Sequence, residues 1–187
     1  MNFRTTEIEG VIIIEPKVLR DHRGYFFRSY SQPDFEKRIR KIDFVHENVS
    51  KSMHGVLRGL HFQKMPYTES KLVRVSMGKV LDIAVDLRKN SPTFGQHVAV
   101  ELSEDNKKQL FIPRGFAHGF VVLSDVAVFQ YKCDNVYASQ AEGSVRWNDP
   151  ELNIDWRLPE DQIILSEKDK MSPFLKDLDY VFDEGNL

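Results

Sequence analysis

Histidine, arginine and lysine residues gather in three short, largely apolar segments of the sequence. Residues 55–63 read GVLRGLHFQ and include Arg58 and His61, residues 71–75 read KLVRV, and residues 113–120 read PRGFAHGF. Imidazole changes charge near neutral pH, so it serves in proton transfer or as a metal ligand, whereas guanidinium and ammonium groups bind anions. These residue types therefore allow acid–base catalysis, a metal centre or an anion-binding site.

The segments that carry these residues have the composition of β-strands. Short β-branched and aromatic runs recur along the chain and are separated by turn signals such as residues 21–24 and 90–92. Strands at this spacing favour an antiparallel sandwich or barrel over a parallel α/β sheet. We expect strands over the following residues: Val11–Glu15, Tyr25–Tyr30, Phe44–Val49, Val56–Gln63, Lys71–Ser76, Val80–Leu87, His97–Leu102, Gln109–Ile112, Gly119–Leu123 and Ala127–Cys133.

Residues 81–87, which read LDIAVDL, alternate between aliphatic and other side chains, so Asp82 and Asp86 share one face of the expected strand. That polar face lies either against solvent or inside a barrel, and the pattern is compatible with both. Helices are expected only at Pro33–Lys41 and Ser166–Leu175. The sequence thus predicts an all-β fold with a few short peripheral helices.

The composition narrows the class of protein. The chain has 187 residues, 26 Lys and Arg against 28 Asp and Glu, and a formal net charge of −2. This length suggests one domain over residues 1–187. The charge balance argues against a nucleic-acid partner, while a local anion site stays open. One cysteine, no apolar segment of membrane-spanning length and no signal-peptide pattern predict a cytoplasmic protein without a membrane partner.

Two of the segments are similar to the motifs of the cupin superfamily. The first cupin motif is a glycine followed after five residues by His-x-His, and the second reads Pro-x-Gly-x-x-His. Residues 55–61 fit the first motif except that Gln63 stands at its second histidine, and residues 113–118 fit the second. The candidate metal ligands form an incomplete set: His61, His118 and Glu69. Divalent metals need several such ligands together, so we expect neither a metal nor another cofactor.

A longer set of segments resembles the dTDP-4-dehydrorhamnose 3,5-epimerase family. The matching segments occur in order between about Gly10 and Asp169: residues 55–63, 71–75, 85–88, 91–95, 112–120 and 165–169. The resemblance implies a cupin jelly-roll sandwich or barrel that needs no metal and forms a homodimer by exchanging strands near the N-terminus. It also implies inversion of C3 and C5 of dTDP-4-dehydro-6-deoxy-D-glucose, which gives dTDP-4-dehydro-L-rhamnose.

The resemblance assigns the steps of this reaction to four catalytic residues. A base must remove a proton next to the C4 ketone, the enolate oxygen needs stabilisation, and a proton must return on the opposite face. The base corresponds to His61, which Asp169 would orient. Lys71 lies at the position that stabilises the enolate, and Tyr131 lies at the position that returns the proton.

The same resemblance implies a pocket for the sugar nucleotide. Its residues correspond to Arg23, Phe26, Arg28, Asn48, Arg58, Lys71, His118, Tyr137, Glu142 and Lys168. Three positions depart from the family pattern on the nucleotide side: Leu19 replaces an aromatic residue, Arg28 a glutamate and His46 a glutamine. Because Arg28 is a hydrogen-bond donor where a carboxylate would accept, the identity of the base stays open.

Three other functions are compatible with the sequence. An epimerase that acts on one carbon, or on another nucleotide-linked 4-keto sugar, would keep the same catalytic residues. A metal-dependent cupin dioxygenase or isomerase would contain stoichiometric metal. A sugar-binding cupin without activity would have no need for the four catalytic residues together.

The spacing of Arg58 and His61 carries a geometric expectation. On an unbroken strand these side chains would point to opposite faces, because their separation is odd. A shared pocket therefore requires a bulge or break at Gly59, where glycine permits one.

Overall fold

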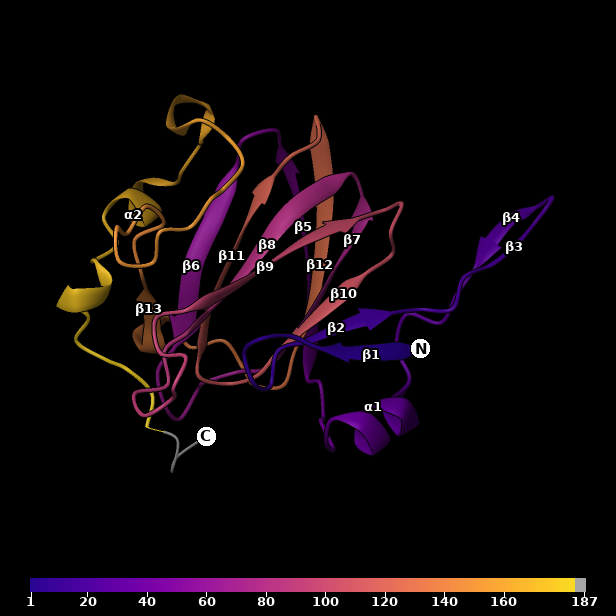
Figure 1. Ribbon diagram of the computed structural model, residues 1–187, viewed down its shortest axis with the longest axis horizontal. Helices are drawn as coiled ribbons and strands as arrows, with labels where there is room; N and C mark the ends of the chain where they lie inside the picture. Colours follow the sequence, from indigo (N-terminus) through magenta and orange to yellow (C-terminus); the bar gives the residue numbers. More distant parts are fainter. Residues whose placement is uncertain (184–187) are drawn as a thin grey trace.

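Two antiparallel sheets enclose an apolar core in the computed structural model, which describes residues 1–183 (Figure 1). The larger sheet has the strand order β1-β2-β10-β7-β12-β5. Its strands are β1 (Asn2–Thr5), β2 (Ile12–Glu15), β10 (Gln109–Ile112), β7 (Lys71–Met77), β12 (Val126–Cys133) and β5 (His46–Met53).

The second sheet has the strand order β13-β6-β11-β8-β9, and a separate hairpin, β3–β4, extends away from both sheets (Figure 1). The strands of this sheet are β13 (Glu142–Ser144), β6 (Leu57–Gln63), β11 (Phe116–Val122), β8 (Lys79–Asp86) and β9 (His97–Ser103). The hairpin consists of β3 (Leu19–Asp21) and β4 (Gly24–Phe26).

The helical segments are short and lie outside the sheets (Figure 1). They are α1 (Gln32–Arg38), α2 (Glu167–Lys170) and the 3-10 turns η1 (Ser139–Ala141), η2 (Glu160–Gln162) and η3 (Leu175–Asp177). None of the helices within residues 1–183 is long and apolar enough to cross a membrane. The prediction of an all-β jelly-roll sandwich with a few short peripheral helices is confirmed.

Each predicted strand falls on an observed one, but several boundaries were wrong. β4 ends at Phe26 rather than Tyr30, β5 runs to Met53, and β11 begins at Phe116. The helix predicted over residues 166–175 ends at Lys170, because Pro173 has no backbone N–H to continue it. The short strands β1, β3 and β13 were missed, since their side chains are exposed or only half-buried and lack an alternating apolar pattern.

The packing on the two faces of β8 shows where its aspartate side chains point. Leu81, Ile83 and Val85 pack in a cluster with the C-terminal segment, including Trp156, which covers the outer face of the smaller sheet. The opposite face looks into the space between the sheets, where Asp82 is fully buried. The polar face of the alternating segment is therefore interior.

The bulge expected at Gly59 is confirmed. Strand β11 places His118 opposite His61 and Phe120 opposite Arg58, so two residues of β6 face one residue of β11. Gly59 has a φ of +137°, and a Cβ atom there would lie 2.5 Å from the Gly119 Cα. Only glycine fits this conformation and this close approach of the two backbones. The extra residue lets Arg58 and His61 line the same cavity.

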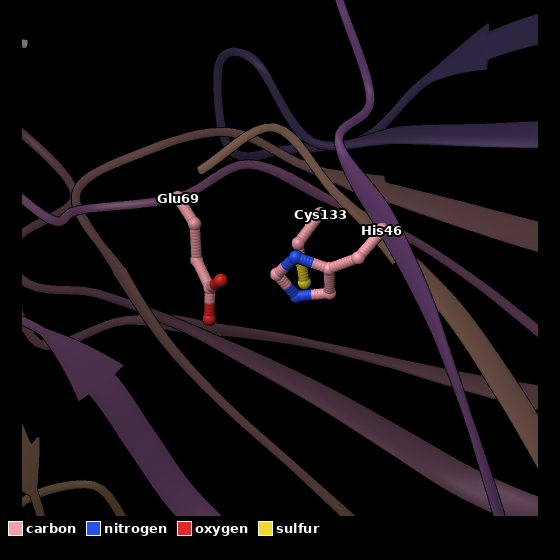
Figure 2. Close-up of side chains that lie close together, drawn as sticks. All are labelled: His46, Glu69 and Cys133. Atoms are coloured by element: carbon pink, nitrogen blue, oxygen red, sulfur yellow. The ribbon is translucent and has the colours of Figure 1, made fainter. Parts of the chain in front are cut away.

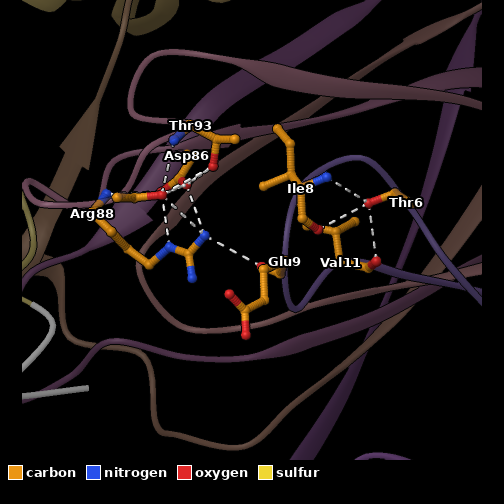
Figure 3. Close-up of polar contacts among 8 residues, drawn as sticks. Thr6, Ile8, Glu9, Val11, Asp86, Arg88 and Thr93 are labelled. Atoms are coloured by element: carbon orange, nitrogen blue, oxygen red, sulfur yellow. Dashed lines mark hydrogen bonds and ion pairs between the residues drawn. The ribbon is translucent and has the colours of Figure 1, made fainter.

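A buried carboxylate ties the N-terminal segment to the smaller sheet (Figure 3). Asp86 accepts hydrogen bonds from the Arg88 guanidinium at 2.7 and 2.9 Å, from the Ser91 hydroxyl at 2.6 Å and from the Thr93 hydroxyl at 2.7 Å. The same guanidinium donates to the Glu9 carbonyl oxygen at 3.2 Å. Burial alone would raise the pKa of Asp86, but these hydrogen bonds outweigh it and the pKa is lowered.

We predict that Asp86→Ala destabilises the protein by about 3–5 kcal/mol, because it removes a buried carboxylate that accepts hydrogen bonds from Arg88, Ser91 and Thr93. Urea unfolding checks this, with the exposed Asp105→Ala as a control that shifts stability by less than about 0.5 kcal/mol. Because the pKa of Asp86 is lowered, its contribution is complete above about pH 4 and is lost as the pH falls further. Equal stabilities of Asp86→Ala and Asp105→Ala at pH 7 would contradict this interpretation.

Candidate active site

A cavity of about 440 Å³ lies between the two sheets. Strands β5, β7 and β12 line it from the larger sheet, β6 and β11 from the smaller one, and residues 164–169 border it as well. The polar side chains among its lining residues are Asn48, Ser50, Arg58, His61, Lys71, His118, Tyr131, Ser166, Lys168 and Asp169. The cavity thus brings together the four residues expected to be catalytic and four of the further residues expected to bind substrate.

His61 and Asp169 form a hydrogen-bonded pair although 108 residues separate them in sequence. The His61 Nε2 and Asp169 Oδ1 atoms lie 2.6 Å apart. Asp169 is held in place by its position on α2, whose N-cap Ser166 accepts a hydrogen bond from the Asp169 backbone N–H. Burial would raise the pKa of Asp169, but the hydrogen bond from His61 and the other favourable contacts lower it. The ionised carboxylate therefore accepts a hydrogen bond from Nε2–H, which keeps the proton on Nε2 and leaves Nδ1 free to act as a base.

Lys71 and Tyr131 lie on the wall provided by the larger sheet. The Lys71 ammonium is 5.9 Å from the centre of the Tyr131 ring and 3.3 Å from the Glu69 carboxylate. Burial raises the pKa of Tyr131, and the charge of Lys71 only partly offsets this effect. Tyr131 is consequently a protonated phenol at neutral pH, and it faces Asn48 across β12 and β5.

A second histidine–carboxylate pair lies deeper between the sheets. The His118 Nε2 and Asp82 Oδ2 atoms are 3.0 Å apart, and Asp82 Oδ1 has no hydrogen-bond partner within residues 1–183. Burial raises the pKa of Asp82 while His118 opposes the rise. Sequence reasoning did not assign Asp82 to the site, although the polar alternation of its strand was the available signal.

Two further predicted residues, Tyr137 and Glu142, meet Lys168 beside the cavity. Lys168, which lines the cavity, forms an ion pair with Glu142. Tyr137 donates a hydrogen bond to the same carboxylate. Burial would raise the pKa of Glu142, but the bonds from Lys168 and Tyr137 lower it. Glu142 is thus an anion whose two partners come from separate segments of the chain.

Three predicted substrate-binding residues lie elsewhere. Arg23 and Phe26 are on the β3–β4 hairpin, and Arg28 follows it; none of them lines the cavity between the sheets. The Arg23 guanidinium pairs with Asp21 at 2.6 Å, and the side chain is 78% exposed. Leu19, one of the departures from the family pattern, pairs with Phe26 in the hairpin. Because the hairpin extends away from both sheets, these residues lie apart from the cavity of their own chain (Figure 1).

We predict that Lys71→Met raises the pKa of Tyr131 further, because it removes the charge that favours the phenolate. The ¹³Cζ chemical shift of Tyr131, assigned with Tyr131→Phe and followed against pH, measures this. Lys51→Met, an exposed lysine on β5, serves as the matched control and leaves the titration unchanged. An unchanged or lower midpoint in Lys71→Met would show that the two groups are not coupled.

Comparisons with known proteins agree on one family. The family model described as dTDP-4-dehydrorhamnose 3,5-epimerase matches residues 5–177. The dTDP-4-dehydrorhamnose 3,5-epimerase of Shigella flexneri is 52% identical over 96% of this chain and 99% of its own.

Two solved structures are similar over most of their length. An epimerase from Legionella pneumophila in complex with dTDP-4-keto-L-rhamnose has a TM-score of 0.92, 48% identity and coverage of 95% of this chain and 94% of its own. A 3′-monoepimerase from Streptomyces bikiniensis in complex with dTDP-quinovose has a TM-score of 0.84, 32% identity and coverage of 91% and 86%. On the extent of the family match and of these similarities, this chain belongs to the dTDP-4-dehydrorhamnose 3,5-epimerase family.

Proposed function

We propose that this protein epimerises C3 and C5 of dTDP-4-dehydro-6-deoxy-D-glucose and forms dTDP-4-dehydro-L-rhamnose. Membership of the family supports the substrate and the reaction. The observation that carries the assignment is the His61–Asp169 pair, which faces the same cavity as Lys71 and Tyr131.

The arrangement of the cavity supports a role for each group. His61 removes the proton next to the C4 ketone, and Asp169 keeps the Nε2 proton in place so that Nδ1 presents its lone pair. The Lys71 ammonium stabilises the negative charge that develops on the C4 oxygen. The Tyr131 phenol then donates its proton to the carbanion carbon from the other side. His61 and Tyr131 come from opposite sheets, and inversion requires a base and an acid on opposite faces of the sugar ring.

The cations of the cavity suit the diphosphate of the substrate. Arg58, Lys71 and Lys168 all line the cavity, although the net charge of the chain is −2. Guanidinium and ammonium groups bind phosphate oxygens through charge-assisted hydrogen bonds. Asn48 and His118 add polar groups to the same walls.

Deuterium exchange tests the proposed reaction. In heavy water, the wild-type protein incorporates deuterium at both C3 and C5 of the substrate, as read by NMR. His61→Asn removes this exchange, and Asp169→Asn slows it by roughly 100-fold or more, because a positioned base contributes about 100- to 10,000-fold. His97→Asn, outside the cavity, is the control that retains exchange. Exchange at neither carbon would overturn the proposal.

A second outcome of the same experiment corresponds to the single-carbon alternative. Deuterium at C3 alone would assign the protein to monoepimerases such as the similar enzyme of Streptomyces bikiniensis. Both reactions use a base and an acid on opposite faces, so the geometry of the cavity serves either. Activity that is retained after chelator treatment would distinguish either epimerase from a metal-dependent cupin enzyme, which would lose its activity.

We further propose that two chains form a homodimer in which each β3–β4 hairpin completes the cavity of the other chain. The apolar side chains of Leu19, Tyr25 and Phe26 are 54%, 53% and 67% exposed on this hairpin. Exposed apolar groups on a projecting hairpin favour contact with a partner. Such an exchange would bring Arg23, Phe26 and Arg28 to a substrate in the cavity of the other chain.

Mixed dimers test the exchange directly. An Arg23→Ala/Phe26→Ala chain and a His61→Asn chain are each inactive as pure dimers, and mixing them restores about a quarter of wild-type activity. Random pairing makes about half of the dimers mixed, and one of the two sites in each is intact. If the hairpin serves its own chain, no mixture regains activity. A monomer in sedimentation analysis would also contradict the proposal.

We propose that the protein is cytoplasmic. Cys133, its one cysteine, is a buried free thiol, which suits a reducing cytoplasm. Neither nucleic acid nor membrane is proposed as a partner.

A further inference from the structure

A cluster of three metal-binding side chains lies at one end of the larger sheet, outside the residues assigned to the reaction (Figure 2). The ligand atoms of His46, Glu69 and Cys133 all lie within 4.8 Å of one another. His46 begins β5, Cys133 ends β12 directly opposite it, and Glu69 lies just before β7. Three separate segments therefore converge on one point.

Cys133 is buried, and Glu69 and His46 are partly shielded from solvent. Cys133 is 1% exposed and the Glu69 side chain is 11% exposed. Burial and the neighbouring Glu69 raise the pKa of the Cys133 thiol. The thiol is thus protonated and inert towards oxidants at neutral pH, and no step of the proposed reaction uses it.

The donor set points to one class of metal. A thiolate, an imidazole and a carboxylate together suit Zn²⁺ or Co²⁺ and do not suit Mg²⁺ or Ca²⁺, which prefer oxygen ligands. Tetrahedral bonds of about 2.0–2.3 Å place the ligand atoms about 3.3–3.8 Å apart. Ligand atoms that lie within 4.8 Å of one another need to close by no more than about 1–1.5 Å to reach this separation, and the fourth position is left for water.

Metal binding at this point competes with an interaction of the active site. Lys71 pairs with Glu69 at 3.3 Å and lies directly opposite Cys133 in the sheet. A cation bound by Glu69 takes this carboxylate from the Lys71 ammonium and adds a positive charge beside it. Like charges at this range repel, so the ammonium must move or lose its preferred position.

We propose that His46, Glu69 and Cys133 bind one Zn²⁺-class ion, and that binding inhibits the enzyme by removing the carboxylate that holds Lys71. On binding, the Cys133 thiol releases its proton to water as the metal–sulfur bond forms. The inhibitory effect rests on the proposed function, whereas the binding site does not.

Cobalt is the probe for the binding site. Chelator-treated protein is titrated with Co²⁺, and we expect one ion per chain with a near-ultraviolet thiolate-to-cobalt charge-transfer band. Because the chain has a single cysteine, this band reports on Cys133 alone. Zn²⁺ displaces Co²⁺ and removes the band.

Variants separate a built site from a lone thiol. Cys133→Ser abolishes the band, and Glu69→Gln and His46→Gln each weaken Co²⁺ binding by at least about tenfold. The exposed His54→Gln is the control with unchanged affinity. No band in the wild-type protein would overturn the site whatever the variants do. A band that survives unchanged in both Glu69→Gln and His46→Gln would overturn it as well.

The inhibitory effect is measured by the exchange reaction. One equivalent of Zn²⁺ slows deuterium incorporation by at least about tenfold, chelator restores it, and His46→Gln resists Zn²⁺ relative to its own metal-free rate. Full activity with cobalt bound would overturn the inhibition and leave the site intact. A protein with no epimerase activity would contradict the proposed function, and the cobalt spectrum would still decide the site.

Discussion

Ionised and polar groups enclosed between the two sheets must find partners there, and this requirement fixes the arrangement of the site. Asp169 pairs with His61, Asp82 with His118, and Glu69 with Lys71. A buried carboxylate without such a partner costs several kcal/mol. The Asp169–His61 and Asp82–His118 pairs also join separate segments of the chain, so satisfying these charges and assembling the cavity are the same event.

The His61–Asp169 pair shows the point most clearly. His61 lies on β6 and Asp169 on α2, and folding brings these two distant segments of the chain into contact. The bulge at Gly59 turns His61 towards the same cavity as Arg58, and the close approach of Gly119 leaves no room for a side chain at that position. A backbone irregularity and a hydrogen bond therefore set the orientation of one imidazole together.

Much of the fold could be predicted from the sequence, because strand composition and turn signals are local. The bulge could also be predicted, since the odd spacing of Arg58 and His61 conflicts with a shared pocket. The link between His61 and Asp169 was accessible only through the resemblance, because no local pattern relates residues 108 positions apart.

Other features depend on tertiary context and could not be predicted. The alternation of β8 did not reveal whether Asp82 points to solvent or inward, because both faces of that strand are covered in the folded protein. Glu69 was considered only as a cupin metal ligand, whereas the fold places it beside His46 and Cys133, and next to Lys71. The projection of the β3–β4 hairpin away from both sheets (Figure 1) could not be predicted either, because its exposed side chains give no local signal of where the hairpin lies.

The protonation of the His61 ring tests the central claim most directly. In ¹⁵N-labelled protein at neutral pH, two-bond ¹H–¹⁵N correlation spectra distinguish a protonated from an unprotonated ring nitrogen. The 2.6 Å hydrogen bond to an ionised Asp169 predicts that neutral His61 carries its proton on Nε2 and has a free Nδ1. Asp169→Asn should weaken this preference. A proton on Nδ1 in the neutral ring of the wild-type protein would contradict the role of Asp169 and the identification of His61 as the base.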